Sequence, residues 1–136
     1  MNHPADAIGE QKFVSLTTFK RNGDPVASPM WIARDGHHLV VWTPADTWKV
    51  KRAQRDPRVT LSPSSRAGKV AAGAPVLTGS AEVIDDPGYV AQVADLIKAK
   101  YGLGFRIVTL LETVVARGRK PRVALRITPD APDTTS

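Results

Sequence analysis

At 136 residues the chain is long enough for one domain that buries roughly two thirds of the surface of its unfolded form. Its composition, 42% hydrophobic and 24% charged, excludes a disordered chain, and the absence of cysteine excludes disulfides, thiol nucleophiles and zinc–thiolate sites. The net charge of +6 points to an anionic partner: a nucleic acid, an acidic lipid or a polyanionic small molecule.

The first third of the chain predicts a lead-in followed by three strands. Residues 1–12 form the lead-in, with room for one helical turn and without the pattern of a secretion signal. A strand at 13–20 and a second at 25–34 are joined by the turn signal Asn22-Gly23. Pro29 predicts that the second strand lies at an edge, is bulged or stops pairing early. A further turn precedes a third strand at 37–43.

A short basic helix and two more strands are predicted next. The helix begins at Asp46 or Thr47 and ends before Pro57. The strands occupy 58–62 and 75–84, and the loop between them, rich in Ser, Gly and Ala, is expected to be mobile. Gly79, inside the later strand, indicates a bulge or a close approach of another backbone.

The last third predicts a helix that begins at Asp85 and Asp86, a second helical pattern at 105–115, and a closing strand at 121–128. The elements together predict a mainly β protein with α+β content: a six-stranded, antiparallel, Greek-key-like barrel with short helical inserts. We expect a single domain at 13–129 and a disordered tail at 130–136. No apolar run reaches the ~20 residues that span a bilayer, so we expect a cytoplasmic protein without a membrane partner.

Basic residues gather where the start of a helix already favours anions. In the segment 43–58, TPADTWKVKRAQRDPR, the first turns of the predicted helix contain Lys49, Lys51 and Arg52. The helix dipole makes this end positive, so cations here oppose it rather than complement it. A phosphate-bearing ligand resolves the conflict, and we predict that the segment binds one. The alternative is a solvated charged face, with Trp48 in the core or at a dimer contact.

The sequence contains no recognisable side-chain catalyst. It lacks an HExxH motif, a nucleophile elbow, a Walker A loop and a complete GxGxxG. His37 and His38 are adjacent in a predicted strand and point to opposite faces, so they cannot bind one metal together. We therefore predict no metal site, leave the catalytic residues unassigned, and attribute any redox chemistry to a cofactor.

Four segments in order carry a family resemblance: FVSLTTFKRNGDPVASPMWIARDGHHLVVWT, WKVKRAQRDPRVTLS, VLTGSAEVI and RVALRITP. They resemble the pyridoxamine-5′-phosphate-oxidase-like split-barrel flavoproteins, and within them the actinobacterial branch that uses the deazaflavin coenzyme F420. The resemblance implies a split barrel with F420 as cofactor, or FMN as the alternative. It also implies a homodimer with the cofactor at the subunit interface, and such a partner would cover Trp31, Val41 and Trp42.

The resemblance implies the cofactor-binding residues by matching position. In this family the second strand lies along the ring, the join after the third strand binds the phosphate, and the end of the next strand approaches the ring. The residues matched to the ring are Val26, Ala27, Ser28, Pro29, Met30, Trp31, Ser62 and Pro63. The residues matched to the phosphate are Thr43, Asp46, Thr47, Trp48, Lys49, Lys51 and Arg52.

One departure from the family bears on function. Pyridoxamine phosphate oxidases share a C-terminal Arg-x-His pair that holds substrate, whereas the closing strand here, RVALRITPD, has no histidine. Vitamin B6 oxidation is therefore disfavoured, and we expect an F420-dependent reductase that passes a hydride to a small organic electrophile. The alternatives are an FMN-dependent oxidoreductase or flavin-binding protein and, more weakly, a basic barrel that binds nucleic acid. Only three Trp, two Tyr and three Phe are present, in apolar contexts, which gives a poor platform for stacking bases.

Overall fold

The computed structural model describes residues 4–102 and 121–130, with side chains from residue 7 onward. The helix predicted at 105–115 and the tail from residue 131 lie outside the described residues. The described helices are α1 (Pro4–Gly9), α2 (Trp48–Arg55) and α3 (Pro87–Tyr101). The described strands are β1 (Val14–Phe19), β2 (Pro25–Met30), β3 (Ala33–Asp35), β4 (His38–Pro44), β5 (Arg58–Pro63), β6 (Leu77–Ile84) and β7 (Arg122–Pro129).

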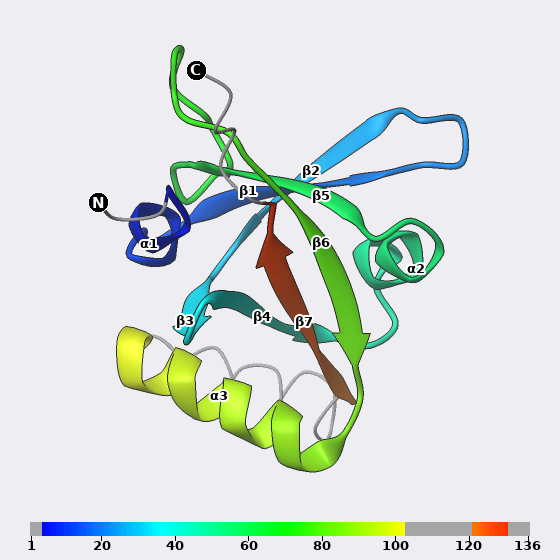
Figure 1. Cartoon of the computed structure of the whole chain (residues 1–136), viewed down its shortest axis with the longest axis vertical. Coiled ribbons are helices and arrows are strands. Elements are labelled where there is room, and N and C mark those ends of the chain that lie inside the picture. Colours follow the sequence, from blue (N-terminus) through cyan, green and yellow to red (C-terminus); the bar gives the residue numbers. More distant parts are fainter. Residues whose placement is uncertain (1–3, 103–120, 131–136) are drawn as a thin grey trace.

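All the described strands join one curled antiparallel sheet in the order β2-β1-β5-β6-β7-β4-β3, which confirms the mainly β barrel class (Figure 1). The prediction of six strands was wrong, because this sheet has seven. The expected strand at 25–34 is interrupted at Trp31 and Ile32, where the chain leaves its pairing with β1 and begins to pair with β4. β2 and β3 are therefore the two edges of the sheet, although they are consecutive in sequence.

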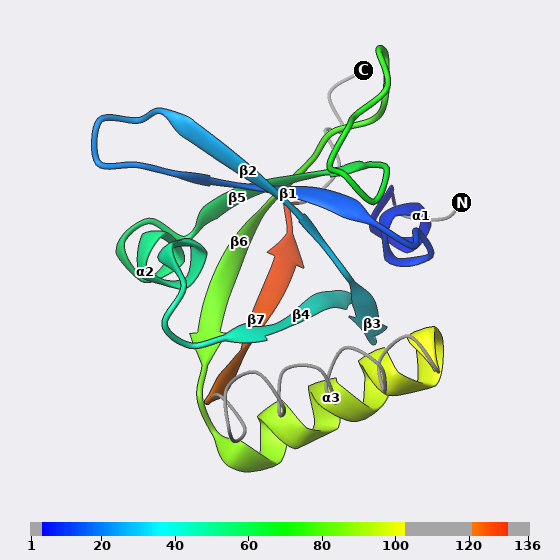
Figure 2. The ribbon, with the colours of Figure 1, turned by 180° about the vertical axis from the view of Figure 1, so that it is seen from behind.

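The β1–β2 hairpin extends away from the body of the barrel, as both ribbon views show (Figures 1 and 2). The predicted turn is confirmed: Gly23 has a positive φ of 90°, and the amide of Lys20 donates to the carbonyl of Asp24 at 2.9 Å. Pro29 is predicted to lie in an edge strand, in a bulge or where pairing stops early. It lies on the edge strand β2, which confirms the first of these alternatives.

Successive side chains of a strand point to opposite faces of the sheet, and an apolar cluster lies on each face. In β4, Val41 faces the barrel interior, where Ile8 of α1 and Ala53 of α2 also lie. Val40 faces the other side, where α3 contributes Val93. Both faces of β4 are thus covered, which explains its nearly continuous apolar run. Val41 is completely buried within the chain, so the expectation that it needs a partner subunit was wrong.

Helix α3 lies against β3, β4 and β7 (Figure 1). Its predicted start is confirmed, because the carboxylate of Asp86 accepts from the amide of Tyr89 at 2.9 Å. At Gly79 of β6, an added Cβ would lie 2.8 Å from the carbonyl of Thr128, so a close approach of another backbone explains this glycine. Among the described helices, none has the length and apolar character needed to cross a membrane.

Candidate functional site

Helix α2 follows β4 directly, and its first turn has no side-chain cap. Thr47 is the N-cap residue, one of the two predicted, with an extended backbone (φ −86°, ψ 155°). Its hydroxyl donates to the carbonyl of Pro44 at 3.2 Å instead of accepting from the helix. The first turn contains no acidic residue, whereas Arg52 and Arg55 complement the dipole at the other end. The amino-terminal end of α2 therefore keeps its positive partial charge.

The side chains of α2 divide between the core and the surface. Val50 and Ala53 are buried against the barrel. Trp48, at the start of the helix, is 70% exposed, and the ammonium of Lys51 lies 4.7 Å from the centre of its ring. The alternative that places Trp48 in the core is therefore wrong. The surface face consists of residues three or four apart: Trp48, Lys51, Arg52 and Arg55.

Two arginines of α2 fix the helix against β1. Arg52 donates through Nε to the hydroxyl of Thr18 at 2.7 Å, and Arg55 donates to the carbonyl of Phe19. Thr18 is opposite Val26 in the β1–β2 ladder, so both side chains project from the same face of the hairpin. The first residue of the predicted ring-binding strand is thus on the face that meets α2.

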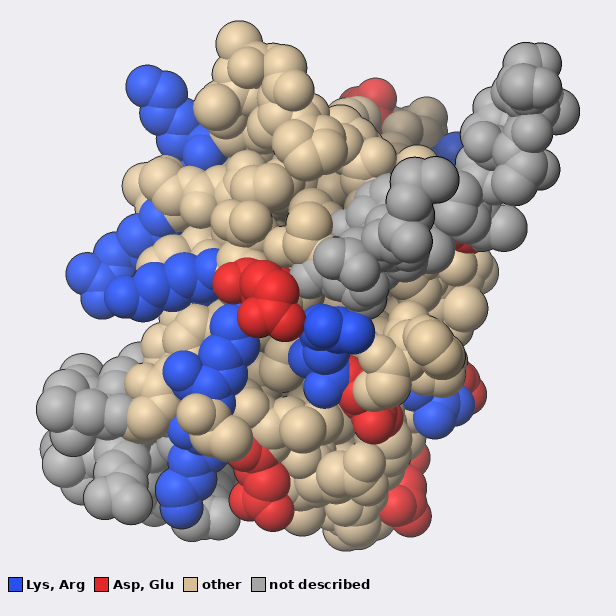
Figure 3. Space-filling model, turned by 60° about the vertical axis from the view of Figure 1, so that its left-hand side comes forward, with Lys and Arg blue, Asp and Glu red and all other residues tan. Residues whose placement is uncertain are grey.

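A groove of about 670 Å³ lies between α2 and the turn of the β1–β2 hairpin, a volume within the usual range for small-molecule sites. Of the six described residues that line it, five are cationic and none is acidic. On the face shown in Figure 3, by contrast, acidic side chains lie among the basic ones. The lining residues are Lys20, Arg21, Trp48, Lys51, Arg52 and Arg55. We call this feature the basic groove.

Lys49 lies in the first turn of α2 but does not line the basic groove. Its side chain is half-buried, and no described residue accepts a hydrogen bond from it or forms an ion pair with it. Burial, and then the charge of nearby Arg52, lower the pKa of its ammonium. An unpaired cation beside a second cation and a positive helix end is electrostatically unfavourable, and a bound anion would reverse the sign of each interaction.

The buried hydroxyl of Thr43 is a second unsatisfied group near the start of α2. Thr43 is only 1% exposed, and its Oγ1 has no hydrogen-bond partner among the described residues. It follows Val41 by two positions in β4, so it projects toward the barrel interior. A buried polar group without a partner costs about 1–3 kcal/mol, and ordered water or a ligand usually satisfies it. Lys49 and Thr43, both predicted to meet a phosphate, thus lack a partner among the described residues.

The residues predicted to line the ring do not share one face. Val26, Ser28 and Met30 are half-buried and pair with Thr18, Leu16 and Val14, whereas Ala27 and Pro29 are exposed on the opposite face of β2. Trp31 lies beyond the end of β2, and its ring stacks on Tyr101 of α3 at 4.4 Å. A planar ligand lying along β2 would contact one of these two sets at a time.

Ser62 and Pro63 lie one strand beyond β1 from the ring-binding strand. Ser15 of β1 is opposite both Pro29 and Ser62, so these two are about 10 Å apart across the sheet. The loop after β5 approaches the same place, because a Cβ on Gly68 would lie 3.3 Å from the ring of Pro29. Internal hydrogen bonds hold this loop, among them one of 2.9 Å from the amide of Ser65 to the carbonyl of Lys69.

Reasoning from sequence missed Lys20 and Arg21, which line the basic groove. Their only signal was their position beside the Asn22-Gly23 turn, and nothing in the sequence related that turn to α2. Of the predicted residues, Trp48, Lys51 and Arg52 lie in the groove, and Asp46 is exposed just before the helix.

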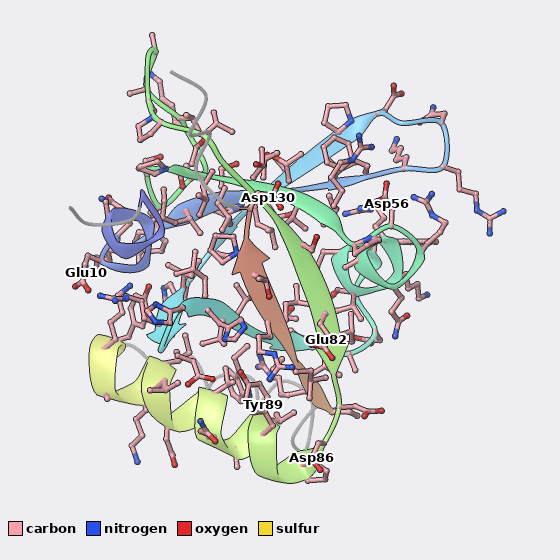
Figure 4. The ribbon with its side chains drawn as sticks, viewed as in Figure 1. Glu10, Asp56, Glu82, Asp86, Tyr89 and Asp130 are labelled. Carbon is pink, nitrogen blue, oxygen red and sulfur yellow. The ribbon has the colours of Figure 1, made fainter. Side chains whose placement is uncertain are left out.

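A second cluster of ionisable side chains lies away from α2. The hydroxyl of Tyr89 donates to Asp35 at 2.8 Å, and Arg126 forms an ion pair with Glu82 at 2.7 Å (Figure 4). Burial and the contact with Asp35 raise the pKa of Tyr89. Tyr89 thus connects α3 to Asp35 of β3, and the guanidinium of Arg126 in β7 lies 5.3 Å from the centre of the Tyr89 ring. Among the described residues, no group of three His, Cys, Asp or Glu side chains is arranged to bind a metal.

Comparisons with known proteins place this fold. No curated protein sequence matches the chain. An F420 reductase has a similar structure, with a TM-score of 0.60 and 18% identity over 96% of this chain and 97% of that one. A FAD-binding protein from Mesorhizobium loti has a TM-score of 0.61 and 18% identity over 93% and 87% of the two chains. The heme storage protein HutZ from Vibrio cholerae has a TM-score of 0.64 and 15% identity over 97% and 93%.

At these identities the similar structures establish the fold alone, and their ligands differ: F420, FAD and heme. The sequence itself gives the family. A family model described as pyridoxamine 5′-phosphate oxidase matches residues 4–135, nearly the whole chain. The chain therefore belongs to the pyridoxamine 5′-phosphate oxidase family.

Proposed function

We propose that the protein is a deazaflavin-dependent oxidoreductase that transfers a hydride between coenzyme F420 and a small organic electrophile. Family membership and the structural similarity to an F420 reductase support this proposal. Support also comes from charge: the coenzyme carries a phosphate and an anionic oligoglutamate tail, and the described residues of the basic groove include five cations and no acid. When bound, the deazaflavin supplies the hydride chemistry, and the protein supplies binding and orientation.

One observation carries the proposal: Lys49 is half-buried near Arg52, at the uncapped start of α2, and has no partner among the described residues. Folding leaves this ammonium partly dehydrated, and no carboxylate or carbonyl in the described part of the chain accepts a hydrogen bond from it. A cation kept in that state is disfavoured in the free protein and favoured once an anion arrives. We assign Lys49 and the first-turn amides of α2 to the coenzyme phosphate.

The other assignments follow from the positions of β2 and of the basic groove relative to α2. Val26 projects toward α2, and with Ser28 and Met30 it forms the half-buried face of β2, which we assign to the ring. The basic groove, on the surface face of α2, is assigned to the anionic tail. We assign no proton donor among the side chains, so in this scheme solvent supplies the proton that accompanies hydride transfer.

We also propose that the functional unit is a homodimer. β2 is an edge strand whose residues alternate between exposed and half-buried, and its hairpin extends from the barrel (Figure 2). An exposed edge beside the proposed ring site favours a twofold partner that covers both. Sedimentation equilibrium at micromolar concentration tests this, and a monomer would contradict a site shared between subunits.

Binding measurements with the purified protein distinguish F420 from FMN. We expect oxidised F420 to bind more tightly, because FMN has a phosphate but no tail to occupy the basic groove. Stoichiometric FMN that co-purifies and that F420 cannot displace would refute the proposal in favour of the FMN alternative, which the similarity to a FAD-binding protein supports.

Heme serves as a third ligand in the same titration. His38, at the start of β4, lies six residues and roughly 20 Å from Pro44 at the end of that strand, beyond which the chain leads into α2. Heme bound through this histidine would therefore leave the α2 site available to F420, whereas competition between the two would point to a shared site.

A further inference from the structure

The barrel has a seam where β2 and β3 fail to pair. They are the two edges of the sheet, and only Trp31 and Ile32 connect them. The side chain of Ile32 is completely buried, yet its backbone belongs to no ladder. Buried backbone N–H and C=O groups need partners, so something other than a neighbouring strand must satisfy those of Ile32.

Two consecutive residues at the end of α3 provide these partners. The hydroxyl of Tyr101 accepts from the amide of Ile32 at 3.0 Å and lies 2.8 Å from the carbonyl of Lys12. The ammonium of Lys100 donates to the carbonyl of Ile32 at 2.6 Å, and also to those of Gly9 (2.8 Å) and Gln11 (2.6 Å). All three donors of an ammonium are thereby used.

The contacts of Lys100 are unlike those of an ordinary surface lysine. Burial lowers the pKa of its ammonium, and the nearest acidic influence, from Glu10, only partly opposes that effect. Three carbonyls from two separate segments surround one cation, much as ligands surround a bound ion. Beside them the ring of Tyr101 stacks on Trp31, with 8° between the planes. The seam is thus held by side chains in place of a ladder.

We propose that Lys100 and Tyr101 are positioning residues, which fix the bend at Trp31 and Ile32 and so hold β2 in place for the cofactor. The second half of this proposal rests on the assignment of β2 to the ring under the proposed function. Without these contacts, the only backbone hydrogen bonds that the described residues make near the end of β2 would be those to β1, and side-chain packing of Met30 and Ile32 alone would hold that end against the barrel. Neither Lys100 nor Tyr101 contacts the ring of the cofactor in this scheme, and both act through β2.

The seam itself is tested without any cofactor. Tyr101→Phe keeps the stacked ring and removes the hydroxyl, and Lys100→Met keeps the aliphatic stem and removes the ammonium. Hydrogen exchange followed by NMR should show the Ile32 amide exchanging about tenfold faster in Tyr101→Phe, as the loss of one hydrogen bond predicts. In Lys100→Met we expect faster exchange across 9–12 and at Ile32. Lys98→Met, an exposed lysine of the same helix, is the charge-matched control.

A spectroscopic signal and a binding measurement then separate positioning from mere stability. With 5-fluorotryptophan, one of the three indole resonances, that of Trp31, should shift in both variants. Affinity for oxidised F420 should fall about tenfold in both, at a temperature where each is folded. Val93→Ala weakens the packing of α3 without touching the seam, and we expect it to leave the affinity unchanged.

Lys100 and Tyr101 have two proposed roles, holding the seam and positioning β2, and each role can be refuted independently of the other. Unchanged exchange at Ile32 and at 9–12 in both variants would overturn their role at the seam. Faster exchange with unchanged affinity, or an equal loss of affinity in Val93→Ala, would overturn the positioning role. If the parent protein binds neither F420 nor FMN, the proposed function fails, and exchange and fluorine shifts still decide whether these side chains hold the seam.

Discussion

Replacement of Lys49 by methionine should weaken anion binding without weakening the fold. Methionine keeps most of the apolar stem and removes the ammonium, which has no partner among the described residues. A charge-assisted hydrogen bond to a phosphate contributes about 1.5–3 kcal/mol, so the dissociation constant of F420 should rise roughly ten- to a hundredfold.

The free energy of unfolding of the same variant should stay unchanged or rise slightly. Because burial and Arg52 lower the pKa of Lys49 in the folded protein, the unfolded chain binds more protons just below the ordinary lysine pKa of 10.5. The free energy of unfolding of the parent should therefore rise with pH in that window. Lys49→Met removes this contribution, so its unfolding free energy at neutral pH should equal or slightly exceed that of the parent.

Isothermal titration with F420 and urea unfolding measure the two quantities on the same preparations. Lys98→Met, which removes one exposed lysine from α3, controls for net charge. Raising the salt concentration should weaken binding by the parent more steeply than binding by the Lys49 variant. If Lys49→Met binds F420 within twofold of the parent, the assignment of the phosphate to the start of α2 is wrong. A clear loss of stability with unchanged affinity would instead make Lys49 an ordinary structural residue.

Four further predictions concern the same site and the core around it. Affinity for F420 should fall as pH rises, starting below 10.5 because the pKa of Lys49 is lowered, and titrations across this range should show no such fall in Lys49→Met. Replacing Lys20 and Arg21 together by glutamine should reduce affinity for F420 and its salt dependence but leave that for FMN unchanged, as fluorescence titration can determine. Thr18→Val removes an acceptor 2.7 Å from an arginine of α2 and should lower the urea-unfolding free energy by about 1–2 kcal/mol. Leu125→Ala, at a completely buried position, should cost about 2–5 kcal/mol in the same assay, and a smaller loss would mean that the core closes around the cavity.

Local signals in the sequence were sufficient where a few neighbouring residues decide the structure. The turn at Asn22-Gly23 depends on residues that tolerate positive φ, and the start of α3 depends on Asp86 as a cap. The antiparallel barrel class followed from short strands of β-branched residues separated by turn signals. The cationic first turn of α2 was also visible, because helix ends and charges are both encoded within one segment.

Tertiary structure alone decided which distant residues meet. The sequence of 25–34 is a mostly apolar segment with two prolines, and only the curl of the sheet divides it into two edge strands at Trp31. Lys20 joins the basic groove because the hairpin brings its turn to α2, and Lys100 reaches the carbonyls of a segment some 90 residues earlier. Periodicity and propensity describe a residue's own element, whereas these contacts depend on how the elements pack, so the sequence predicted the elements and their caps but not the groove or the seam.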